Sequence, residues 1–311
     1  MAAPASRTDL AVSFCGIQLK NPIIAASGTF GYGVEFEDIL HLDKLGGLVV
    51  KGLSKEPMIG NPPPRLYETA AGMLNAIGLQ NIGAQAFVGE KLPKLRELKD
   101  VVVFANVFGY TRQDYERTIQ ILNEGEGIAA YELNVSCPNT AHGGIQFGSD
   151  PRSLEEVVSL AKRVSRRPLI VKLSPNVTSI AHMAKVAQDA GADAISLINT
   201  FVAMAIDAET RKPRIANITA GLSGPAIKPI ALRMVFDAAK VVKIPVIGMG
   251  GISKAEDIIE FMLAGATAVQ IGTASYWDPR ATEKTVDELE QWCVEHRVAK
   301  VSELTGGLKL E

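Results

Sequence analysis

The sequence is poor in cysteine, in net charge and in long apolar runs, and each shortage excludes a class of protein. Only three of the 311 residues are cysteines, at positions 15, 137 and 293. Their wide spacing and odd number argue against a disulfide framework, and three thiols cannot supply the four ligands of an iron–sulfur cluster. No metal site is predicted.

The charges are nearly balanced, with 32 Lys and Arg against 34 Asp and Glu. Because no run of like charge stands out, neither a nucleic acid nor an acidic membrane surface is an expected partner, and a small molecule is. The start, MAAPASRTDL, lacks the apolar core of a signal peptide, and the apolar runs are too short to cross a bilayer. We therefore expect a cytoplasmic protein, and one domain over residues 1–311, since no linker interrupts the chain.

Eight short apolar runs alternate with amphipathic stretches along the chain. Residues 150–167, 178–191 and 253–266 have the apolar spacing of helices, with Ser or Asp near their starts. This alternation predicts a single α/β domain, a (β/α)₈ TIM barrel. The predicted strands are residues 21–28, 46–52, 101–107, 131–136, 168–174, 194–200, 244–251 and 268–274.

A doubly wound sheet is the alternative fold, but GTFGYG at 28–33 has the wrong glycine spacing for a dinucleotide fingerprint. Ahead of the first barrel strand, TDLAVSF and IQLKN flank Cys15-Gly16 and predict an N-terminal β-hairpin at the bottom of the barrel. Three connections, 52–80, 136–150 and 201–226, are longer than a barrel needs. Such long loops at the C-terminal face are usually functional.

Each apolar run ends in a polar residue or in glycine. The carboxyl ends of barrel strands meet at one face, where binding and chemistry occur, so we expect these residues to surround one site. The ends are Ser27-Gly28, Lys51, Asn106, Asn134, Lys172, Asn199-Thr200, Gly250-Gly251 and Gly272-Thr273.

The residue types of this ring indicate what it holds. Two lysines at the mouth of an apolar barrel are costly unless they face an anion or an electron-accepting ring. Asparagines, including Asn75 in the first long loop, donate and accept, which suits a heterocycle with alternating carbonyl and N–H groups such as a flavin or a pyrimidine. The glycines after the last two strands let backbone amides approach a phosphate. Together these features favour FMN.

Cys137 differs from the other two cysteines. It lies in a polar loop over the predicted active face, three residues after Asn134 and next to Pro138. We interpret Cys137 as a catalytic residue, and Cys15 and Cys293 as small buried apolar residues.

Several longer motifs are GMLNAIGLQN, ELNVSCPNT, VKLSPNV, LINT, GLSGPAIKP and PVIGMGGI. Together they resemble the class 1 dihydroorotate dehydrogenases, most closely class 1B, the catalytic subunit of the NAD-linked enzyme. The likeness runs in order from about residue 10 to residue 280. The resemblance implies an FMN barrel that oxidises (S)-dihydroorotate to orotate in pyrimidine synthesis. One departure is Ala220, where we expect the family to have glycine.

The resemblance also implies residue roles, with Cys137 and Lys51 as catalytic residues. The implied FMN contacts are Ser27, Lys51, Gly52, Asn106, Asn134, Lys172, Ile198, Gly224, Gly250, Gly251, Gly272 and Thr273. The implied substrate contacts are Lys51, Asn75, Ala76, Ile77, Gly78, Leu79, Asn134, Asn199 and Thr200. In this interpretation FMN takes a hydride from C6 of the substrate and Cys137 takes a proton from C5.

The reduced cofactor needs an electron acceptor, and the chain has no dinucleotide fingerprint. Class 1B implies a partner subunit with FAD and a [2Fe-2S] cluster that passes electrons to NAD⁺, in a heterotetramer built on a homodimer of this chain. Class 1A, which uses fumarate, stays open. The quinone-linked class 2 is disfavoured because cysteine, not serine, is the expected base. A dihydropyrimidine dehydrogenase domain and a non-redox phosphate-binding barrel are further alternatives.

Overall fold

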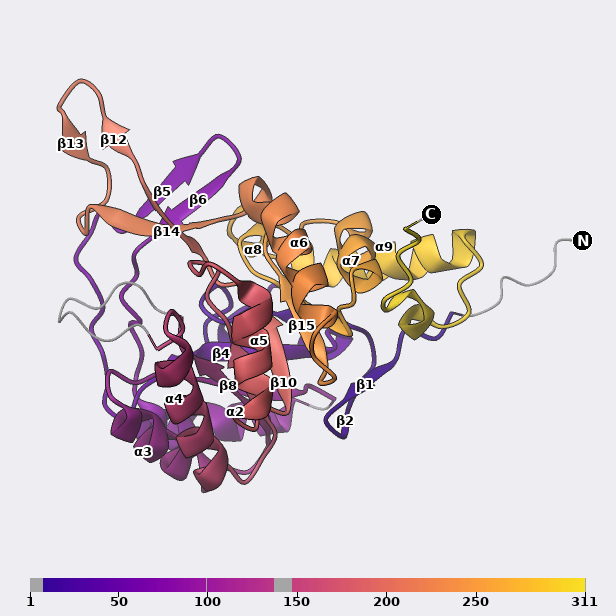
Figure 1. The fold of residues 1–311 in the computed structure, drawn as a ribbon, viewed down its shortest axis with the longest axis horizontal. Coiled ribbons are helices and arrows are strands. Elements are labelled where there is room, and N and C mark those ends of the chain that lie inside the picture. Colours follow the sequence, from indigo (N-terminus) through magenta and orange to yellow (C-terminus); the bar gives the residue numbers. More distant parts are fainter. Residues whose placement is uncertain (1–7, 99, 137–146, 311) are drawn as a thin grey trace, which may run out of the picture.

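The chain forms a closed barrel of eight parallel strands in the computed structural model, which describes residues 8–98, 100–136 and 147–310 (Figure 1). Neighbours in the barrel follow chain order, and the last strand pairs with the first. This confirms the predicted (β/α)₈ fold. The strands are β3 (Ile23–Ala25), β4 (Gly47–Leu53), β7 (Val103–Val107), β8 (Ile128–Asn134), β9 (Leu169–Lys172), β10 (Ala194–Leu197), β15 (Val246–Met249) and β16 (Ala268–Ile271).

Helices surround the barrel because each has one apolar side that packs on the strands. The three predicted helices are present, as α4 (Pro151–Val164), α5 (Ile180–Asp189) and α7 (Ala255–Leu263). Asp150 and Ser179 accept hydrogen bonds from backbone amides in the first turns of α4 and α5. The other helices are α1 (Ala84–Ala86), η3 (Phe87–Lys91), α2 (Leu92–Glu97), α3 (Arg112–Asn123), α6 (Lys228–Ala239), α8 (Ala274–Trp277) and α9 (Ala281–Glu295).

Short single-turn helices occupy several connections. They are η1 (Val34–Phe36), η2 (Leu42–Lys44), η4 (Pro225–Ile227) and η5 (Val301–Leu304). Within the described ranges, no helix is both long and apolar enough to cross a membrane.

The predicted N-terminal hairpin consists of β1 (Val12–Phe14) and β2 (Ile17–Leu19), joined by Cys15-Gly16. Both turn residues have positive φ, 53° and 77°, as a tight hairpin turn requires. The Phe14 ring stacks on Phe104 with 6.1 Å between centroids, and the Cys15 thiol donates to the carbonyl of Asp193 at 3.2 Å. Because Asp193 directly precedes β10, the hairpin lies at the amino-terminal end of the barrel.

Two of the three long connections pair with each other at the opposite end of the barrel instead of remaining irregular loops. β5 (Leu66–Thr69), β6 (Gly72–Asn75), β11 (Phe201–Met204) and β14 (Thr219–Ser223) form an antiparallel sheet in the order β11-β14-β6-β5. A small ribbon of β12 (Ile206–Asp207) and β13 (Lys212–Pro213) extends from it, at the upper left of Figure 1. The pairing joins segments far apart in the chain, which short-range sequence patterns do not reveal.

This sheet has its own apolar cluster, and Ala220 belongs to it. Leu74, Ala76, Ile215 and Ala220 are each at most 2% exposed and pack together. Ala220 lies opposite Ala203 in an ordinary antiparallel register and does not have a positive φ. The backbone at this position therefore accepts a β-carbon without strain, so the departure from glycine leaves the sheet intact.

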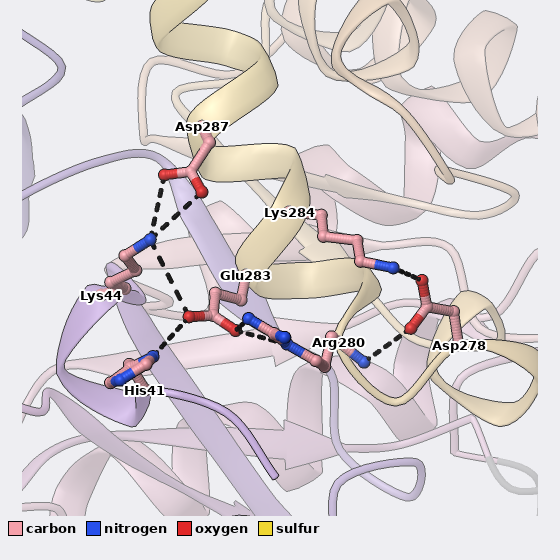
Figure 2. Close-up of polar contacts among 7 residues, drawn as sticks. All are labelled: His41, Lys44, Asp278, Arg280, Glu283, Lys284 and Asp287. Atoms are coloured by element: carbon pink, nitrogen blue, oxygen red, sulfur yellow. Dashed lines mark hydrogen bonds and ion pairs between the residues drawn. The ribbon is translucent and has the colours of Figure 1, made fainter.

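An ion cluster fixes the start of α9 to the segment before β4 (Figure 2). Its centre is Glu283, whose side chain is 2% exposed and accepts from His41 Nδ1 at 2.7 Å and from Arg280 Nη2 at 3.0 Å. Around it, Lys44 pairs with Asp287 at 3.1 Å, and Lys284 pairs with Asp278 at 2.5 Å. Burial opposes ionisation of Glu283, but the hydrogen bonds from His41 and Arg280 outweigh it and lower its pKa.

Replacing Glu283 with Gln should lower the free energy of unfolding by about 1–3 kcal/mol, because the buried side chain loses the negative charge that strengthens its hydrogen bonds from His41 and Arg280. Since the folded-state pKa is lowered, this contribution is present above the unfolded pKa of about 4.3 and is lost as the pH falls through the folded value. Urea unfolding at neutral pH and near pH 4 measures both effects. Asp287→Asn, an exposed carboxylate of the same cluster, is the control and should change stability by less than about 0.5 kcal/mol. An equal loss in both variants would contradict this account.

Candidate active site

One cavity receives residues from the carboxyl ends of all eight barrel strands. It contains about 1280 Å³ of empty space, part of which is open to solvent. The small sheet contributes Met73, Asn75 and Ser223 to the wall, which means that the two paired connections cover the barrel mouth.

The cavity brings together the residues that the sequence analysis grouped. All twelve predicted cofactor residues line it, as do all but one of the predicted substrate residues. The exception is Ala76, whose side chain packs in the small apolar cluster. Its backbone is also occupied, since its N–H donates to the Arg65 carbonyl and its carbonyl accepts from Asn61 Nδ2.

The ring of strand ends divides into two halves of different chemistry. The connections after β15 and β16 contribute Gly250, Gly251, Gly272 and Thr273, with Gly224 beside them. Gly251 has φ of 79°, and a β-carbon there would lie 2.8 Å from the carbonyl oxygen of Gly224. Only glycine fits this close approach, so bare backbone faces the cavity and can approach a phosphate.

The other half of the ring carries the lysines and asparagines, among them Lys51. Lys51 is half-buried at the end of β4, and no carboxylate among the described residues pairs with it. Burial, followed by repulsion from Arg65, lowers the pKa of Lys51. A bound anion would stabilise the charged form of Lys51, so this part of the cavity suits a carboxylate.

The amides beside Lys51 are held by a chain of hydrogen bonds. Asn199 Nδ2 donates to Ser136 Oγ at 2.5 Å, and Ser136 Oγ donates to Asn134 Oδ1 at 3.0 Å. The Tyr115 hydroxyl donates to the Asn134 carbonyl at 2.8 Å, which anchors the end of β8 to helix α3. Asn134 and Asn199 therefore face the cavity in defined positions, as recognition of a polar ring requires.

Beneath the cavity lies a carboxylate that the sequence analysis missed. Glu132, on β8, is fully buried and accepts from Asn106 Nδ2 at 2.7 Å, Ser196 Oγ at 2.9 Å and Gln270 Nε2 at 2.6 Å. Lys172 Nζ lies 3.5 Å from the same carboxylate. The sequence did contain a signal for Glu132, which is a charged residue inside an apolar strand. A buried charge requires partners, so such a residue indicates a buried polar network.

The three cysteines have different positions. Cys137 lies in residues 137–146, outside the described part of the chain. Burial raises the pKa of both Cys15 and Cys293 to about 11, so neither is a thiolate at neutral pH. Neither Cys15 nor Cys293 therefore has the reactivity expected of a catalytic thiol.

The family model for dihydroorotate dehydrogenase matches residues 9–292. The chain belongs to the dihydroorotate dehydrogenase family. A protein of Solibacter usitatus, provisionally named dihydroorotate dehydrogenase A (fumarate), is 60% identical over 96% of this chain and 98% of its own length.

Other members carry a different name. The catalytic subunit of dihydroorotate dehydrogenase B (NAD⁺) of Citrifermentans bemidjiense is 54% identical over 98% of this chain and 99% of its own. The protein of the same name from Geobacter sulfurreducens is 52% identical over the same shares. The names of the relatives therefore differ in the electron acceptor and agree on the oxidised substrate.

The dihydroorotate dehydrogenase family uses FMN, and the cavity fits such a group. Asn106 Oδ1 and Gln270 Oε1 are buried without a hydrogen-bond partner among the described residues, although both side chains line the cavity. A β-carbon on Gly52 would lie 2.9 Å from Asn106 Oδ1, so glycine avoids crowding this oxygen. Unsatisfied buried acceptors are rare in folded proteins and indicate a missing donor.

Orotate should bind more weakly as the pH rises through the lowered pKa of Lys51, because the neutral amine does not attract a carboxylate. The dissociation constant, followed by flavin absorbance from about pH 6 to 10, measures this. Lys51→Met should weaken binding at neutral pH by about tenfold or more and flatten the profile. An unchanged affinity across this range in the wild-type protein would contradict the role of Lys51.

Proposed function

We propose that the chain is the catalytic subunit of an NAD⁺-linked, class 1B dihydroorotate dehydrogenase. It oxidises (S)-dihydroorotate to orotate in pyrimidine synthesis. The observation that carries this proposal is the cavity itself, in which a lysine without a carboxylate partner among the described residues, a ring of amides and a glycine-lined end converge at the barrel mouth. Membership in the family and the names of the relatives support it.

The substrate lies on the lysine and asparagine half of the ring. Lys51 binds its carboxylate, while Asn75, Asn134 and Asn199 pair with the carbonyl and N–H edges of the dihydropyrimidine. Thr200 and the segment 77–79 complete the pocket. The small sheet that carries Asn75 covers the mouth and so limits the access of water to the substrate.

The phosphate of FMN would be held at the glycine-lined end formed by Gly224, Gly250, Gly251, Gly272 and Thr273. Ser27, Gly52, Asn106, Lys172 and Ile198 contact its ring system. When bound, FMN supplies the acceptor for the hydride that leaves C6. The positive charge of Lys172 favours negative charge on the ring system, and Glu132 holds this ammonium in place.

The proton leaves C5, and Cys137 accepts it. The sequence carries this assignment, since ELNVSCPNT puts Cys137 three residues beyond Asn134, which does line the cavity. A thiol with the ordinary pKa of about 8.5 is a weak base at neutral pH, so the loop must favour the thiolate.

Replacing Cys137 with Ala should leave FMN bound but slow flavin bleaching by dihydroorotate by about 10²–10⁴-fold, because the proton acceptor is gone. Anaerobic stopped-flow absorbance measures the rate. Cys137→Ser is the matched variant and should retain more activity, with its optimum moved to higher pH. A rate for the Ala variant equal to that of the wild-type protein would exclude Cys137 as the base.

The electrons pass to a partner subunit with FAD and a [2Fe-2S] cluster, and from there to NAD⁺, in a heterotetramer built on a homodimer of this chain. The seven relatives named as NAD⁺-linked catalytic subunits support this route. A second candidate is direct transfer to fumarate in a class 1A enzyme. It is favoured by the 60% identical relative from Solibacter usitatus.

Turnover of the isolated chain separates the two electron acceptors. With dihydroorotate as donor, the class 1B proposal predicts slow turnover with fumarate and NAD⁺ reduction only after an electron-transfer subunit is added. Rapid fumarate reduction by the chain alone would instead establish the class 1A candidate. A matched substrate control is dihydrouracil, which lacks the carboxylate; preference for it over dihydroorotate would indicate a dihydropyrimidine dehydrogenase.

A further inference from the structure

A single buried carboxylate organises the floor of the cavity. The four donors around Glu132 come from four different strands: Asn106 from β7, Lys172 from β9, Ser196 from β10 and Gln270 from β16. Asn106 and Lys172 meet Oε1, whereas Ser196 and Gln270 meet Oε2. Both oxygens are thus engaged by donors, as an ionised carboxylate requires.

An ionised carboxylate only accepts hydrogen bonds, and this dictates how the two neighbouring amides are oriented. Each must turn its NH₂ group toward Glu132, since a carbonyl oxygen in its place would face a negatively charged oxygen at less than 3 Å. The amide carbonyls are therefore the free ends. They are Asn106 Oδ1 and Gln270 Oε1, the two buried acceptors without a partner among the described residues.

We propose that Glu132 is a positioning residue that sets the hydrogen-bond polarity of the cofactor pocket. By binding the NH₂ groups of Asn106 and Gln270, it makes the pocket floor present carbonyl oxygens, which accept from a ring N–H of the bound group. This proposal rests on the FMN site proposed above. The oxidised isoalloxazine ring has one N–H, at N3 between two carbonyls, and that N–H is the donor the floor selects.

Lys172 completes the pattern. Lys172 is 5% exposed and lines the cavity, and its ammonium lies 3.5 Å from the same carboxylate. The amide oxygens of the floor can accept from a ring N–H, and the neighbouring Lys172 ammonium can donate to the carbonyl next to that N–H. Glu132 thus arranges an acceptor and a donor from different strands around one imide edge.

Glu132→Gln tests this arrangement because the shape is kept and the polarity is changed. A glutamine has one accepting and one donating end, so one neighbouring amide must turn over or lose its bond. A turned amide presents N–H where the pocket presented a carbonyl, and it then opposes the flavin N–H. The variant should lose its preference for a flavin that can donate at N3.

The experiment compares FMN with FMN methylated at N3, each added to full-length chain freed of flavin, with affinity measured by quenching of flavin fluorescence. The wild-type protein should bind FMN at least about tenfold more tightly than the methylated form, because the methyl group leaves a buried acceptor unpaired. In Glu132→Gln this ratio should fall to about threefold or less, which reflects the lost selection of the N–H.

Ser196→Ala is the matched control. It also removes a buried hydrogen bond to Glu132, but it leaves the bonds to Asn106 and Gln270, and Ser196 does not line the cavity. It should keep the wild-type ratio. A general disturbance of the barrel would lower the affinity for FMN in both variants. It would not change the ratio of the two flavin affinities in Glu132→Gln alone.

Three outcomes would overturn the proposal: equal binding of both flavins by the wild-type protein, an unchanged ratio in Glu132→Gln, or a lost ratio in Ser196→Ala. The first needs no variant, so the proposal stays testable if Glu132→Gln does not fold. Failure of the wild-type protein to bind either flavin would instead contradict the proposed function. A preference for FMN that Glu132 does not control would contradict this inference alone.

Discussion

The site depends on a buried carboxylate in the middle of a parallel barrel. Glu132 has no exposed surface, and removing such a charge from water is costly unless donors surround it. Four donors from four strands do so. This requirement joins β7, β8, β9, β10 and β16 beneath the cavity, so the same interaction that neutralises the charge also determines which atoms face a ligand.

The two lysines of the cavity differ in whether a carboxylate of the described residues pairs with them. Lys172 lies 3.5 Å from Glu132, so its charge is balanced within the protein. Lys51 has no carboxylate partner in the described part of the chain, and burial and Arg65 lower its pKa. The charge of Lys172 is therefore balanced within the protein, whereas that of Lys51 can be balanced by a bound ligand. The second kind of cation is the one that makes affinity depend on a substrate carboxylate.

The barrel and the small sheet contribute differently to the site. The barrel positions side chains at strand ends through parallel pairing, in which neighbours follow chain order. The sheet of β5, β6, β11 and β14 covers the mouth and brings Met73, Asn75 and Ser223 to the cavity. Its own apolar cluster stabilises it, and Phe201 and Leu222 of the same sheet also pack against the barrel core. Met73, Asn75 and Ser223 are therefore carried by a paired structure and not by irregular loops.

Much of this architecture could be predicted from local patterns. Apolar runs that end in Lys51, Asn106 or Lys172 indicate parallel strands and their ends, and the barrel geometry then requires those ends to converge. The residues predicted from their place at a strand end line the cavity for this reason. Ala76 shows the limit: its place in a site-like motif suggested a contact, but pairing within the small sheet turns its side chain into an apolar cluster.

The sequence by itself determined the strand order, the hairpin, the ring of polar strand ends and the resemblance to dihydroorotate dehydrogenases, because these follow from short-range periodicity and contiguous motifs. Only the tertiary structure decided that Glu132, Ser196 and Gln270 meet beneath the cavity, that Lys51 lacks a carboxylate partner among the described residues, and that two distant connections pair into a sheet. These are contacts between residues far apart in the chain. No local pattern specifies them, since they exist only once the barrel has closed.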